Sequence, residues 1–195
     1  MLITLLLDIN AIEAETIMLN QPYFFNLPKV IGLRLVGNIS DSVTQIDVVL
    51  SINKYLRQLS MDKCFVEFIG EGCKQLTILE REIISCMCDE YGALVSFFPS
   101  DSSLIAYLTN SGRTSENVEC IETYLKTAKF FQTYDSSCDL IDYSETFEFN
   151  LSSIVATCSG PKRSQDKVDY DELHKQFKNC LVESVGPTVS ACLED

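Results

Sequence analysis

Segments typical of β-strands alternate with segments typical of α-helices along most of this 195-residue sequence. Apolar or alternating runs predict strands within residues 29–37, 64–72, 92–101 and 144–151. Runs with a helical period predict helices at residues 10–19, 44–59, 76–87, 101–111, 116–131 and 169–181. Since strand–helix–strand units at this spacing form parallel sheets, the pattern predicts an α/β fold with a largely parallel sheet.

The helix expected after residue 44 has the clearest local signals. Thr44 followed by Asp47 is a capping-box pattern, and the helix should continue to about Leu59. The residues expected on its inner face are Val43, Ile46, Val49, Leu50, Leu56 and Leu59. Gly112 is expected to end the helix at 101–111, and the G-E-G sequence at residues 70–72 is expected to form a tight turn.

Composition indicates one domain with an apolar core. Apolar residues make up 46% of the chain, and 195 residues are enough for one core but few for two. No run approaches the roughly 20 apolar residues of a membrane helix, and the first residues lack the positive segment of an export signal. We therefore expect a soluble, cytoplasmic protein without a membrane partner.

The nine cysteines are expected to be free thiols, most of them acting as small buried apolar residues. Cys86 and Cys88 form a C-x-C pair, the other cysteines are scattered, and the sequence has no C-x-x-C. No four ligands at the spacing of a zinc site can be assembled, so no metal site is expected. His174, the single histidine, lies in a polar helical stretch, where a solvated position is expected rather than a general base.

The stretch CSGPKRSQDKV, residues 158–168, is basic although the formal net charge of the chain is −13. That net charge opposes broad contact with nucleic acid, because phosphates are repelled at long range. Within the stretch, the hydroxyl of Ser159 and the charges of Lys162, Arg163 and Lys167 suit a local anion site. A solvated linker over residues 158–169 with incidental charge explains the same residues equally well.

A set of longer segments carries a family resemblance. They read IEAETIMLNQP, LPKVIGLRLVG, KYLRQL, FVEFIGEG, CDEYGALVSFFP, TNSGR, ETYLKTAKFF and CSGPKRSQDKV. In this order they resemble the aconitase family, most closely the branch of cytosolic aconitase and the iron regulatory proteins, from about residue 11 to 182. The resemblance implies a three-layer α/β/α aconitase-type domain at residues 1–157. It also implies that the basic loop, polar helix and tail at 158–195 lead toward a third domain.

The resemblance implies that this chain alone does not catalyse the aconitate hydratase reaction. In the family, a 4Fe–4S cluster is held by three cysteines from an S-C-T-N segment and a later C-x-x-C, and neither occurs in these 195 residues. No cofactor is therefore expected in this chain. Glu90 matches the family's active-site glutamate, but Cys86 stands where the family has asparagine, and Asp89 where it has proline. On topology alone, Glu90 is more simply a surface carboxylate, because it precedes a strand.

Binding of an RNA hairpin is the other function that the resemblance implies. Iron regulatory proteins bind the iron-responsive element, and Arg57, Ser159 and Lys167 match family RNA contacts. We therefore expect a truncated iron regulatory module in iron homeostasis, with weak affinity for the hairpin and no small-molecule substrate. The alternative is an inactive fragment of a 4Fe–4S aconitate hydratase with no function of its own.

Overall fold

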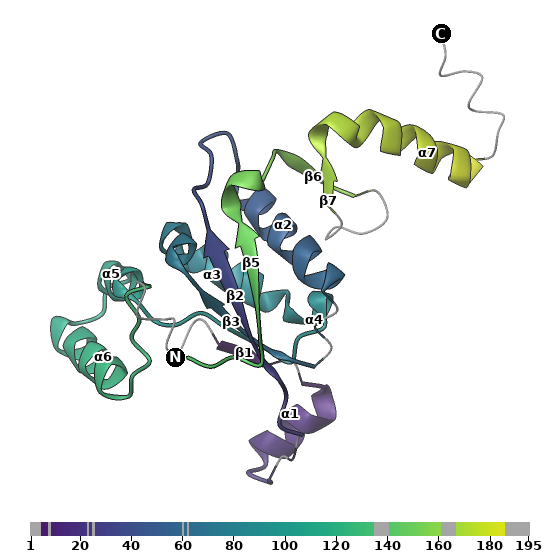
Figure 1. Cartoon of the computed structure of the whole chain (residues 1–195). Helices are drawn as coiled ribbons and strands as arrows, with labels where there is room; N and C mark the ends of the chain where they lie inside the picture. Colours follow the sequence, from purple (N-terminus) through teal and green to yellow (C-terminus); the bar gives the residue numbers. More distant parts are fainter. Residues whose placement is uncertain are drawn as a thin grey trace.

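The computed structural model describes residues 5–7, 9–22, 24, 26–59, 61, 63–134, 141–160 and 167–185. Strands and helices alternate along them, as the sequence predicts (Figure 1). In chain order they are β1 (Leu5–Leu7), α1 (Ala11–Met18), β2 (Val30–Val36), α2 (Gln45–Gln58), β3 (Phe65–Ile69), the 3-10 helix η1 (Glu71–Gln75), α3 (Ile78–Cys86), α4 (Cys88–Tyr91), β4 (Val95–Phe97), α5 (Ser102–Asn110), α6 (Ser115–Thr127), β5 (Glu145–Asn150), η3 (Leu151–Ser153), β6 (Thr157–Ser159), β7 (Lys167–Asp169), η4 (Tyr170–Glu172) and α7 (Leu173–Val185).

The main sheet has five strands in the order β1-β4-β3-β2-β5. Strands β4, β3, β2 and β5 pair in parallel, and β1 joins the β4 edge in antiparallel orientation. The chain moves from β2 to β3 and β4 on one side and later returns to place β5 on the other side of β2. This arrangement confirms the predicted α/β class and the largely parallel sheet.

The main core lies between one face of this sheet and the helices that connect its strands. Leu33 and Leu35 of β2, Phe68 of β3 and Ile52 of α2 are fully buried in one apolar cluster, which also contains Ile84 of α3. Burying one such side chain contributes roughly 1.5–3 kcal/mol relative to leaving it exposed. Side chains two residues apart on a strand point to the same face of the sheet. The helices that contact these β2 and β3 residues therefore all cover one face.

A second, smaller apolar cluster lies beneath α5 and α6. It contains Leu104 and Leu108 of α5, Val118 and Leu125 of α6, and Ile78 at the start of α3. In Figure 1, α5 and α6 lie at one side of the sheet, and the β6–β7 hairpin lies at the other. We call residues 101–131 the α5–α6 lobe.

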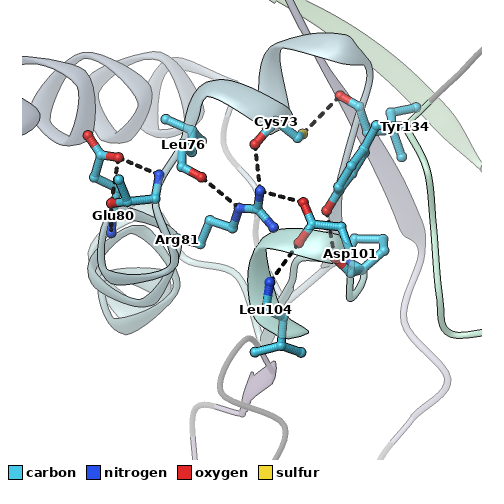
Figure 2. A network of polar contacts seen from close by, with 10 residues as sticks. Cys73, Leu76, Glu80, Arg81, Asp101, Leu104 and Tyr134 are labelled. Carbon is cyan, nitrogen blue, oxygen red and sulfur yellow. Dashed lines mark hydrogen bonds and ion pairs between the residues drawn. The ribbon is translucent and has the colours of Figure 1, made fainter. Parts of the chain in front are cut away.

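Arg81 connects this lobe to the main core, as Figure 2 shows. The side chain of Arg81 is 0% exposed, and its Nη2 donates to Asp101 Oδ2 and to the Cys73 carbonyl, both at 2.8 Å. Its Nε donates to the Leu76 carbonyl at 3.2 Å. The other carboxylate oxygen of Asp101 accepts from Leu104 N and so caps α5. One guanidinium therefore fixes η1, α3 and α5 relative to one another.

The G-E-G sequence does more than form a turn. Gly70 has a φ of +91°, which favours glycine, and a Cβ there would lie 2.6 Å from the Leu35 carbonyl oxygen. A Cβ on Gly72 would lie 2.8 Å from the same oxygen. The two glycines thus allow η1, whose Cys73 carbonyl accepts from Arg81, to pack directly on β2.

Two predictions about local structure are wrong. Ile46 is 65% exposed, whereas Val49, Leu50 and Leu56 are buried as expected. Asn53 lies on the same side of α2 as Ile46, two turns later, and is buried. The inner face was therefore predicted correctly, but at the first turn of α2 this face is exposed. Residues 158–169 are not simply a linker, because both ends of that stretch belong to the strands β6 and β7.

Candidate nucleic-acid interface

The β6–β7 hairpin brings two of the predicted RNA-binding residues together. The strands are antiparallel, and Ser159 is the cross-strand partner of Lys167. Residues opposite each other in such a pair have Cβ atoms about 4.5–5.5 Å apart. Ser159 is exposed. Lys162 and Arg163, which the sequence assigned to the same anion site, lie outside the described residues.

The hairpin is attached to the first turn of α2 through Asp47. The backbone N–H and the hydroxyl of Thr157, in β6, both donate to Asp47 Oδ1 at 2.7 Å. The other oxygen, Oδ2, accepts from the backbone N–H of Thr44 at 2.8 Å and from its hydroxyl at 2.7 Å. The predicted capping box is therefore confirmed, and the same carboxylate also binds a strand that is 110 residues distant.

These hydrogen bonds determine the ionisation of Asp47. Burial alone would raise the pKa of this carboxyl, because it disfavours the charged form. The hydrogen bonds from Thr157 and Thr44 favour the carboxylate and outweigh burial, so that the pKa lies below its ordinary value. At neutral pH Asp47 is therefore an anion that accepts from neutral groups.

A hollow of about 170 Å³ lies where α2, the end of β5, η3 and Lys167 meet. It is lined by Ser51, Lys54, Tyr55, Gln58, Phe149, Ser153, Ile154 and Lys167. The Tyr55 ring lies 5.1 Å from the Phe149 ring, and the Tyr55 hydroxyl donates to the Glu148 carbonyl at 3.0 Å. The hollow thus combines aromatic walls with two lysines.

Arg57, the third predicted RNA-binding residue, lies in the last turn of α2 and is partly exposed. It directly precedes Gln58 and is three residues from Lys54, both of which line the hollow. Residues three apart are neighbours on a helix surface. The structure therefore places Arg57, Ser159 and Lys167 on two neighbouring elements.

Lys167 is not a freely exposed cation. Its Nζ lies 3.1 Å from Asp169 Oδ1, and its side chain is only 11% exposed. Part of its charge is therefore offset within the protein. Lys54, by contrast, is exposed on α2. Lys54 and the Asp47–Thr157 contact were missed from the sequence; the helical spacing of Lys54 and Arg57 is a signal that could have identified the lysine.

The residues that match or replace the family's active site lie on α3 and α4. Glu90 is partly buried in α4, and Asp89 beside it is exposed. Cys86, at the end of α3, is exposed. Residual burial and the negative charge of Glu82 raise the pKa of the Cys86 thiol. Cys86 is therefore mainly a thiol at neutral pH as long as no metal is bound.

The cysteines that the structure describes lie in different environments. Cys73 and Cys88 are buried, Cys86 and Cys120 are exposed, and the others are partly buried, so the expectation that most are buried does not hold among them. Within the described ranges, no three His, Cys, Asp or Glu side chains are grouped so that they could hold a metal ion. A 4Fe–4S cluster needs several converging thiolates, and the described residues do not supply such a group among themselves. His174 is exposed on α7, as expected.

In the part of the chain that the structure describes, no helix has both the length and the apolar character needed to cross a bilayer. The family model described as "Aconitase family (aconitate hydratase)" matches residues 4–189. Because this match covers nearly the whole sequence, the chain belongs to the aconitase family.

Proposed function

We propose that this chain is an RNA-contacting module of the iron regulatory branch of the aconitase family, and that α2 and the β6–β7 hairpin form its contact surface. One observation supports this most strongly. Ser159 and Lys167 are cross-strand partners, and the hairpin that carries them is bound to the helix that carries Arg57. Three positions identified only by resemblance thus lie on two elements that are in contact, and one of them, Lys167, lines a hollow with a second lysine.

The chemistry of these residues suits an RNA hairpin. Sequence-specific proteins bind unpaired loop bases through side-chain hydrogen bonds, while cations hold the phosphates. The exposed hydroxyl of Ser159 can donate to or accept from a base edge. Arg57 and Lys54 supply positive charge on the neighbouring helix. The net charge of −13 and the pairing of Lys167 with Asp169 both weaken the attraction, so we expect a low affinity.

The test is a titration of a fluorescent iron-responsive-element hairpin at low salt with wild type, Arg57→Gln and Lys167→Gln. Each substitution should weaken binding and reduce the slope of log affinity against log salt by about 1, as expected for one lost phosphate contact. Lys129→Gln is the matched control, because Lys129 is exposed in the α5–α6 lobe, on the other side of the sheet from the hairpin (Figure 1). Equal binding by all four proteins would reject the proposed surface.

The competing reading is an inactive portion of an aconitate hydratase with no activity of its own. It predicts no saturable binding of the hairpin by the wild type at any salt concentration. The same titration with a scrambled hairpin of equal length separates the two readings. Equal affinity for both RNAs would leave only charge attraction and favour the inactive reading.

We also infer that these 195 residues do not catalyse the aconitate hydratase reaction by themselves. The S-C-T-N and C-x-x-C segments are absent from the sequence, and Cys86 and Asp89 replace family residues next to Glu90. Incubation with iron and sulfide under anaerobic conditions should give no stable visible absorption and no turnover of citrate. A stoichiometric cluster bound to this chain would contradict the inference.

A further inference from the structure

We propose that Asp47 is a positioning residue for the RNA surface: its contact with Thr157 sets where Ser159 and Lys167 lie relative to Arg57. This inference rests on the proposed function for its consequence, but its structural part can be tested without RNA. Asp47 contacts none of these three residues directly in the hydrogen bonds described above. It would act through the placement of the hairpin.

Both oxygens of the Asp47 carboxylate accept hydrogen bonds, although none of the donors described is a cation. Asp47 is 3% exposed, and each of its oxygens accepts two hydrogen bonds. One pair comes from Thr44, which precedes the same helix, and the other pair comes from Thr157. Hydrogen bonds to a charged group are stronger than neutral ones, and a buried carboxylate that loses donors is strongly disfavoured. The hairpin is thus bound to α2 at a defined point.

The distance from this point to the RNA surface is short. Ser159 lies two residues after Thr157, and Lys167 is opposite Ser159. Since a strand rises about 3.3 Å per residue, both residues lie about 7 Å along the hairpin from the fixed point. A hairpin released at Thr157 would no longer hold them at a constant distance from Arg57. A site that is misplaced by about 1 Å can lose much of its binding strength.

The contact between Thr157 and Asp47 can be weakened without disturbing the cap of α2. Thr157→Val removes the hydroxyl donor but keeps the backbone N–H and the branched shape. Thr157→Ser restores the donor. Thr44→Ala is the matched control, because it removes a hydroxyl from the other oxygen of the same carboxylate and leaves the hairpin contact intact.

The first measurement is amide hydrogen exchange in residues 157–159 and 167–169. Thr157→Val should speed exchange there by about tenfold, the factor that corresponds to one lost hydrogen bond to a charged group. Thr157→Ser should exchange like wild type, and Thr44→Ala should change exchange at the start of α2 but not in the hairpin. Hairpin exchange that is equal in wild type and Thr157→Val would overturn the proposal.

The second measurement is affinity for the fluorescent iron-responsive-element hairpin. Thr157→Val should weaken binding about three- to tenfold, with recovery in Thr157→Ser and no loss in Thr44→Ala. Faster exchange with unchanged affinity would show that the contact holds the hairpin but does not position the site, and would overturn the proposal. If the wild type binds no RNA, the proposed function fails, and the exchange comparison alone then decides whether Asp47 fixes the hairpin.

Discussion

Arg81 and Asp47 are both buried charged residues, and each attaches a peripheral segment to a helix of the main domain by different means. Arg81 joins the α5–α6 lobe through an ion pair with Asp101 (Figure 2), and the lobe has an apolar cluster of its own. Asp47 joins the β6–β7 hairpin through neutral donors of Thr157, beside an open hollow. A segment with its own apolar cluster should separate only when the core unfolds. The hairpin buries Val168, but no residue of β6 or β7 belongs to either apolar cluster, so the hairpin can separate by itself.

The largest expected effect is at Arg81. Arg81→Met leaves Asp101 buried without its cation and the Cys73 and Leu76 carbonyls without their donor, which should cost about 3–5 kcal/mol of unfolding free energy. Urea denaturation followed by circular dichroism measures this change. The control is Lys126→Met, which removes an exposed pair with Glu122 and should cost less than about 1 kcal/mol. Similar losses of unfolding free energy in both variants would show that the buried Arg81–Asp101 pair stabilises the protein no more than an exposed ion pair does.

A smaller effect separates a glycine packed against β2 from a glycine at the exposed turn of the lobe. Gly70 and Gly112 both have positive φ, but a Cβ would meet the Leu35 carbonyl at Gly70 and nothing within 4 Å at Gly112. Gly112→Ala should therefore cost about 1–2 kcal/mol from backbone strain alone. Gly70→Ala should cost about 1–3 kcal/mol more, because β2 or η1 must shift. Equal destabilisation, measured by thermal unfolding, would show that η1 can move away from β2 freely.

The smallest effect is the response of the hairpin to acid. Because the pKa of Asp47 is lowered from its ordinary value of 3.8, its contribution is fully present above that value and is lost as the pH falls through the folded-state pKa. Amide signals of residues 157–159 should therefore shift in acid before those of α5 and α6. Asp47→Asn should abolish this early shift. Simultaneous change of hairpin and lobe signals would contradict independent release of the hairpin.

Arg81 itself does not titrate at low pH. Burial alone would lower the pKa of its guanidinium, but the hydrogen bond and charge of Asp101 outweigh burial and raise the pKa above its ordinary value. Arg81 therefore remains charged throughout the acid titration.

Contacts between residues close in the sequence could be predicted from the sequence, whereas contacts between distant residues could not. The capping box of Thr44 and Asp47 depends on residues three apart, so that its pattern is visible along the chain. The bonds from Thr157 to the same carboxylate depend on the placement of β5 beside β2, which no local pattern contains. The same limit applies to Arg81 and Asp101, twenty residues apart on different helices.

The candidate site was predictable by position but not by geometry. Resemblance identified Arg57, Ser159 and Lys167, but not that Ser159 lies opposite Lys167 or that Asp169 pairs with the lysine. The composition of residues 158–169 suits a linker, and its strands are only three residues long, too short for an alternating pattern. Cys120 illustrates the same difficulty, since an average preference for burial cannot locate one thiol on the outer side of α6.

The shared carboxylate of Asp47 also has a consequence for the inheritance of this sequence. Two threonines depend on one side chain, so a substitution at position 47 would disturb the start of a helix and the attachment of a distant strand at once. Positions 44, 47 and 157 should therefore change together, if at all, among descendants of a common ancestor that keep the docked hairpin. A lineage that replaced Thr157 by a residue without a hydroxyl would lose one reason to keep aspartate at 47, and glutamate or glutamine would then serve the capping box.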